Sequence, residues 1–163
     1  MKGPRHEREG EAARERMTEH RLEEYQLTLR DESDLVVARR HVRELGQSQG
    51  LTALCIEQLA TAVTEIARNV LIHARSGRMA VRSVRGVRGG ALRSLVAVVV
   101  TDEGPGIGDL DAAMADGYST GRGLGMGLSG ARRLVDAFEL TSAVGQGTTV
   151  TLEKWGKEPG DHL

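Results

Sequence analysis

A glutamate and an asparagine spaced by four residues are the first side chains in the sequence that can do chemistry. Glu65 and Asn69 lie in the stretch 51–74, which has no Gly or Pro, and a spacing of four places both on one face of a helix. A carboxylate can take a proton from a hydroxyl group or water, and an amide oxygen one turn away can bind a hard cation such as magnesium. An isolated pair of this kind is far more often a solvated polar pair, so its meaning depends on the other motifs.

A second candidate motif, Asp102-Glu103-Gly104-Pro105-Gly106, directly follows the apolar segment 95–100. A carboxylate at the end of a buried strand has a fixed position, and it can accept a hydrogen bond from an exocyclic amine such as that of adenine. Gly104 and Gly106 let a flat ligand approach the backbone closely. The same residues also suit an ordinary turn, and the motif alone does not decide between the two.

A third motif is glycine-rich, since nine of the 21 glycines fall between Glu103 and Gly130. Glycines alternate along 121–127, directly before a predicted helix, and free N–H groups at a helix start can hold a phosphate. A flexible loop explains the glycine content but not its place beside a helix start. Residues 125–130 also match a dinucleotide-binding fingerprint, but the strand that must precede that fingerprint is missing.

Hydrophobic periodicity predicts the elements that must position these motifs. In chain order they are a strand at 25–29, a helix capped by Ser33 and ending near Gly50, a long helix at 51–74, strands at 78–85 and 92–101 joined by a hairpin at 86–90, a helix at 124–137, and strands at 139–142 and 148–154. The unbroken apolar run 95–100 indicates a central strand of the sheet. This order predicts an α+β fold, a two-layer sandwich with a mixed or antiparallel sheet and helices on one face.

Composition excludes several other classes of protein. The 163 residues carry 22 Lys and Arg against 23 Asp and Glu, with one cysteine and four aromatic residues. One cysteine forms no internal disulfide and no zinc cluster, and near-zero charge with few aromatics argues against nucleic-acid binding. No run is long enough to span a membrane and the start shows no secretory signal, so we expect a soluble, cytoplasmic protein. Residues 1–24 are expected to be a disordered charged tail, 25–155 one domain and 156–163 a short tail.

The motifs occur together and in order, and together they resemble the nucleotide-binding boxes of the ATPase superfamily that gyrase, a heat-shock chaperone, mismatch-repair proteins and sensor histidine kinases share (GHKL). Residues 64–69 resemble its N box, 102–107 its first glycine box and 123–128 its second. Gly147-Thr148 resembles the last element of the site. The resemblance implies the Bergerat ATP-binding fold, with ATP and magnesium as cofactors.

Within that superfamily the chain is similar to the RsbT-type serine/threonine kinases of bacterial partner-switching and stressosome modules. The similarity is carried by 65–70, 116–120 and 125–136, and extends from about Tyr25 to Lys154. It implies a kinase that phosphorylates a small anti-sigma-antagonist (STAS-domain) partner, with a downstream phosphatase or sigma factor as a further partner. It implies no nucleic acid and no membrane as partners.

The resemblance also implies a role for each matching residue. Glu65 is expected to be the catalytic general base and Asn69 the magnesium ligand. Asp102 is expected to accept from the adenine amine, directly and through a water shared with Thr148. The other expected nucleotide contacts are Gly104 and Gly106 with adenine, and Gly123, Leu124, Gly125, Met126 and Gly127 with the phosphates. Arg122 departs from the small residue expected there, and no role is assigned to it.

The motifs leave two other functions open. The chain can be a nucleotide-bound anti-sigma factor that sequesters its partner with little phosphotransfer, because anti-sigma kinases of this superfamily carry the same boxes. It can also be an ATPase subunit that dimerises on ATP binding, as gyrase does, although no transducer domain follows Lys154.

Overall fold

The computed structural model describes residues 23–115 and 127–156. Its elements in order are β1 (Glu24–Leu29), α2 (Glu32–Ser48), α3 (Ala53–His73), β2 (Gly77–Arg88), β3 (Ala91–Asp102), α4 (Leu110–Met114), α5 (Gly127–Leu134), β4 (Ala137–Ser142) and β5 (Thr148–Trp155). The predicted motif at 116–120 and the predicted phosphate contacts Gly123, Leu124, Gly125 and Met126 lie outside the described residues. Within them, no helix combines the length and the apolar character needed to span a bilayer.

The five strands form one sheet in the order β1-β2-β3-β5-β4, with every neighbouring pair antiparallel. The central place predicted for the apolar strand is confirmed, because β3 is the third of the five. The β2–β3 hairpin closes at Gly89 and Gly90, whose φ angles are 61° and 78°. Both strands therefore continue further toward this turn than the sequence predicted.

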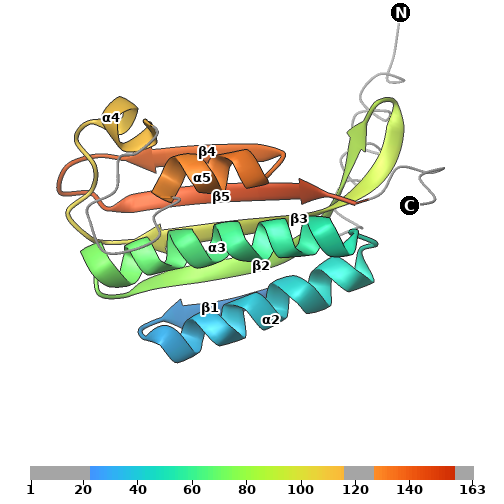
Figure 1. Cartoon of the computed structure of the whole chain (residues 1–163), viewed down its shortest axis with the longest axis horizontal. Coiled ribbons are helices and arrows are strands. Elements are labelled where there is room, and N and C mark those ends of the chain that lie inside the picture. The colour runs from blue at the N-terminus through green and yellow to red at the C-terminus, as the bar shows by residue number, and fades with distance from the viewer. Residues whose placement is uncertain (1–22, 116–126, 157–163) are drawn as a thin grey trace, which may run out of the picture.

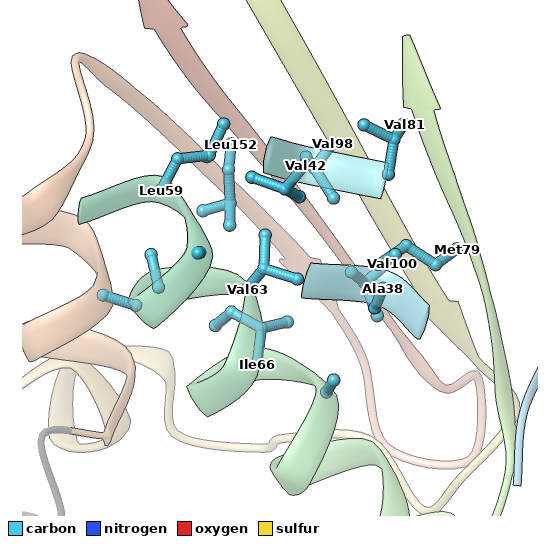
Figure 2. Packing of buried hydrophobic residues seen from close by; sticks show 14 of the residues in the cluster. Ala38, Val42, Leu59, Val63, Ile66, Met79, Val81, Val98, Val100 and Leu152 are labelled. Atoms are coloured by element: carbon cyan, nitrogen blue, oxygen red, sulfur yellow. The ribbon is translucent and has the colours of Figure 1, made fainter. Parts of the chain in front are cut away.

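The helices α2, α3 and α5 cover one face of the sheet, so the predicted two-layer α+β sandwich is confirmed (Figure 1). Figure 2 shows side chains of α2 and α3 facing those of β2, β3 and β5 across the core. Successive strand residues point to opposite faces, and Val96, Val98 and Val100 of β3 are buried under the helices. Val99 and Thr101, which alternate with them, are partly exposed on the other face.

The helix α2 begins two residues earlier than predicted, because Asp31 and not Ser33 is its N-cap. The Asp31 carboxylate accepts from the backbone N–H groups of Ser33 and Asp34, and the Asp34 carboxylate accepts from the N–H of Asp31. This reciprocal arrangement is a capping box. For α3 the N-cap is Thr52, whose hydroxyl accepts from the N–H of Cys55 at 3.0 Å.

The segment between β3 and β4 differs from the prediction at two places. The one-turn helix α4, capped by Asp109, was not predicted, and its buried residue is Ala113; a single turn is too short to show a helical period. The helix α5 ends at Leu134, before the predicted end at 137, because Ala137 already pairs with Glu153 of β5.

Candidate functional site

The pair Glu65 and Asn69 lies at the rim of the buried face of α3. Both side chains are half-buried and lie to the same side of the buried Ile66 on the helix. The Glu65 side chain is 21% exposed, and its Oε1 lies 3.8 Å from Nη1 of Arg68 on the same helix. His73, one turn beyond Asn69, is exposed at the end of the helix.

The C-terminal turn of α3 packs directly on the end of β3. A Cβ atom added at Gly104 would lie 2.7 Å from the Cβ of Ala74, and one added at Gly77 would lie 2.7 Å from Val70 Cγ1 and 3.4 Å from Asp102 Cβ. Glycine at these two positions lets the helix and the strand end approach each other. The helix that carries Asn69 therefore meets the strand that carries Asp102, as the site requires.

Three polar side chains form a row across the ends of β3, β5 and β4, on the face that the helices cover. Asp102 pairs with Thr148, and Thr148 pairs with Ser142. Directly paired residues of antiparallel strands have Cβ atoms about 4.5–5.5 Å apart. The Asp102 Oδ1 atom accepts from the N–H of Gly104 at 2.9 Å, which fixes the carboxylate beside Thr148.

The loops on either side of this row pack backbone against backbone. Gly106 and Gly147 have φ angles of 74° and 75°. An added Cβ would overlap the carbonyl group of Ala143 at the first position and that of Asp102 at the second. The N–H of Gly145 also donates to the carbonyl of Pro105 at 2.8 Å. These glycines therefore serve the packing of the two loops, a reason that neither the approach of a ligand nor an ordinary turn had suggested from the sequence.

Ser142 is a further residue of the row that sequence reasoning missed. Its Oγ accepts from the N–H of Ile107 at 2.8 Å, donates to the carbonyl of Gly147 at 2.9 Å and lies 2.8 Å from the Thr148 hydroxyl oxygen. The available signal was a serine at the end of one hairpin strand facing a threonine at the start of the next.

The arrangement fits a nucleotide with its magnesium ion. The Asp102 carboxylate and the Thr148 hydroxyl can bind a base, and α5, which is described from Gly127 onward, packs against α3 (Figure 1). The first N–H groups of a helix can hold a phosphate. No group of three or more His, Cys, Asp or Glu residues within 23–115 and 127–156 can hold a metal by itself. Magnesium bound with a nucleotide needs one or two protein ligands, since phosphate oxygens and water complete its shell, so Asn69 suits that role.

A shallow hollow on the other face of the sheet is not part of this arrangement. Its lining includes Thr28, Arg78, Val99 and Thr101, which alternate with the residues buried under the helices. None of the predicted site residues lines it.

Comparison with known proteins agrees with the fold. Residues 27–154 match the family model of the histidine kinase-like ATPase domain. The chain is 37% identical over 126 residues to the serine/threonine-protein kinase RsbT of Bacillus subtilis, covering 76% of this chain and 90% of that one. It is 31% identical over 103 residues to an anti-sigma F factor of Caldanaerobacter subterraneus, covering 61% and 70%.

A solved structure shows the same fold. The RsbU and RsbW domains of a Mycobacterium tuberculosis protein superpose with a TM-score of 0.54 at 19% identity. The match covers 83% of this chain and 33% of that one, so the chain spans about a third of its length. This similarity therefore shows only that the two proteins share the fold of this domain.

Proposed function

The chain belongs to the histidine kinase-like ATPase domain family and to its RsbT-like kinases, and from this premise we propose that it is an ATP-dependent protein serine/threonine kinase. Its proposed substrate is a small STAS-domain antagonist protein, with a downstream phosphatase or sigma factor as a second partner. The proposed location is the cytoplasm, where partner-switching modules act.

The observation that carries the proposal is the meeting of three segments that are distant in the sequence. The end of α3 with Asn69 packs on the end of β3 with Asp102, and Asp102 pairs with Thr148 of β5. The motifs at 65–69, 102–106 and 147–148 thus share one edge of the sandwich, as a single nucleotide site requires.

In the proposed mechanism, magnesium-bound ATP supplies the phosphoryl group and the charge neutralisation. Asp102 and Thr148 would orient the base, and N–H groups at the start of α5 would bind the phosphates. The amide oxygen of Asn69 would hold the metal ion. Glu65 accepts the proton of the incoming serine or threonine hydroxyl, because phosphoryl transfer depends mainly on positioning and on an oriented nucleophile.

The test compares two glutamates of the same helix. Glu65→Gln is expected to lower transfer of labelled phosphate from ATP to purified STAS-domain proteins of the same genome by about 100-fold or more. Nucleotide affinity is expected to stay within about twofold, because Glu65 acts on the hydroxyl nucleophile and not on the base. Glu57→Gln is the matched control, since Glu57 is exposed, pairs with Arg43 and lies about 12 Å along α3 from Glu65.

Asn69→Ala is expected to remove transfer as well, together with the magnesium dependence of nucleotide binding. Full transfer activity in both Glu65→Gln and Asn69→Ala would contradict the mechanism.

A second candidate function is supported by the similarity to the anti-sigma F factor. In that case the chain would hold a sigma factor in a nucleotide-dependent complex and transfer little phosphate. Measuring sigma-factor binding and phosphotransfer separately on the same preparation distinguishes the two functions. Stable sigma-factor binding without transfer would favour the second.

A further inference from the structure

Ser142 is placed to control which hydrogen-bonding groups the site offers to a base. Its hydroxyl oxygen has three polar neighbours within 2.9 Å. The N–H of Ile107 can only donate, the carbonyl of Gly147 can only accept, and the hydroxyl of Thr148 can do either. The first two neighbours therefore decide the direction of the third bond.

A serine hydroxyl has one hydrogen and two lone pairs. The hydrogen goes to the Gly147 carbonyl at 2.9 Å, and one lone pair receives the Ile107 N–H at 2.8 Å. The remaining lone pair receives the Thr148 hydroxyl hydrogen across 2.8 Å. This assignment follows from the network of partners, and it is the one that satisfies all three contacts. Thr148 thus donates to Ser142 and keeps only lone pairs for anything else it binds.

Thr148 lies directly opposite Asp102, whose carboxylate also only accepts hydrogen bonds when ionised. This end of the site therefore presents two acceptors side by side. A base with an amino group can donate to both, whereas a base with a carbonyl group in the same place meets lone pairs and leaves polar atoms unpaired. Discrimination of this kind is strong, because an unpaired buried polar group is costly.

We infer that Ser142 is a positioning residue that makes Thr148 an obligate acceptor and thereby selects a 6-amino purine nucleotide over a 6-oxo purine nucleotide. The inference rests on the proposed nucleotide site. Ser142 touches Thr148 and the two loops at 103–108 and 143–147, so its effect on the base passes through Thr148.

The test is the ratio of the dissociation constants for ITP and ATP, measured by calorimetry without any protein substrate. The two nucleotides differ at position 6 of the base, which is a carbonyl acceptor in ITP and an amino donor in ATP, and at N1, which carries a hydrogen in ITP and accepts a hydrogen bond in ATP. Ser142→Ala frees the Thr148 hydroxyl to turn and donate, so the ITP-to-ATP ratio is expected to fall about tenfold, the equivalent of one hydrogen bond. Ser142→Thr keeps the hydroxyl and is expected to show the same ITP-to-ATP ratio as the wild type.

Two further variants sharpen the test. Thr141→Ala is the matched control, because Thr141 is the exposed neighbour in β4 on the opposite face, and its ratio is expected to equal that of the wild type. Thr148→Val removes the acceptor itself and is expected to lower the ratio as well. Adding Ser142→Ala to Thr148→Val is expected to lower it no further, because the two residues act through one bond.

A parallel loss of ATP and ITP affinity in Ser142→Ala, with the ratio unchanged, would show a merely structural role and overturn the inference. Equal wild-type affinities for ATP and ITP would overturn it too. Should Ser142→Ala fail to fold, the same ratio is measured for Ser142→Cys and is likewise expected to fall. A thiol keeps the volume of the side chain but is a weak hydrogen-bonding group. A wild-type chain that binds neither nucleotide would instead contradict the proposed function.

Discussion

Asp102 joins the proposed base site to the local backbone. One of its carboxylate oxygens receives the N–H of Gly104, and the residue pairs with Thr148 on the neighbouring strand. The buried strand before it sets the backbone position of Asp102 at the end of β3, and the hydrogen bond from Gly104 orients the carboxylate.

Asp102→Asn is expected to weaken ATP binding by about 10- to 100-fold, since a hydrogen bond to a charged group contributes about 1.5–3 kcal/mol. The amide keeps the size of the side chain and one acceptor, so folding is expected to be preserved. Calorimetric titration with ATP measures the change, and Asp111→Asn, at an exposed position in α4, is the control. Unchanged affinity in Asp102→Asn would show that Asp102 does not bind the base.

At the scale of single elements, both long helices have defined starting points. In α2 the capping box fixes the first turn, and Arg43 joins α2 to Glu57 of α3 through an ion pair of 3.0 Å. Hydrogen bonds from the Ser33 side chain and from the backbone of Asp34 hold the pKa of Asp31 below its usual value. The hydrogen bond from Arg43 likewise lowers the pKa of Glu57.

Because of these lowered pKa values, the stability of the fold is expected to depend on pH in the acidic range. A carboxyl group whose pKa is lower in the folded state stabilises the fold fully above its unfolded pKa of about 4, and this contribution is lost as the pH falls through the folded value. Asp31→Asn keeps an N-cap but removes the titrating group. We therefore expect the free energy of unfolding of Asp31→Asn to fall less than that of the wild type between pH 5 and pH 2, as measured by urea denaturation. An identical decrease in both proteins would contradict the assigned cause.

At the scale of the whole molecule, one core between the helices and the sheet holds the site together. Leu59 of α3 is fully buried in that core, whereas Leu54 of the same helix is 68% exposed. The elements that carry Asn69, Asp102 and Thr148 all pack on this core, so its loss would separate them.

Leu59→Ala is expected to lower the free energy of unfolding by about 2–5 kcal/mol, because it removes buried apolar contacts and leaves a cavity. Leu54→Ala makes the same chemical change on the surface of the same helix, and we expect it to stay within about 0.5 kcal/mol of the wild type. Chemical denaturation measures both. Equal losses in the two variants would mean that Leu59 does not lie in the core described above.

The sequence by itself determined most of the elements, and it singled out the residues that we propose to bear the chemistry. Helical spacing over 51–74 and the apolar run at 95–100 are local patterns. Such patterns can be recognised from neighbouring residues in the sequence alone. They were enough to predict the long helix, the central strand ending near Asp102 and the two-layer α+β class. They did not fix the ends of helices, because Asp31 and Ser33 are both good caps and the reciprocal bond with Asp34 decided between them.

Only the tertiary structure decided how these residues meet. The strand β5 lies between β3 and β4, and this places Thr148 beside both Asp102 and Ser142. The loop carbonyl groups next to Gly106 and Gly147 show why those positions exclude a side chain. Strand order, cross-strand register and contacts between loops depend on packing among segments far apart in the chain. No local pattern encodes them, and so Ser142 became visible as a residue of the site only when the strands were paired.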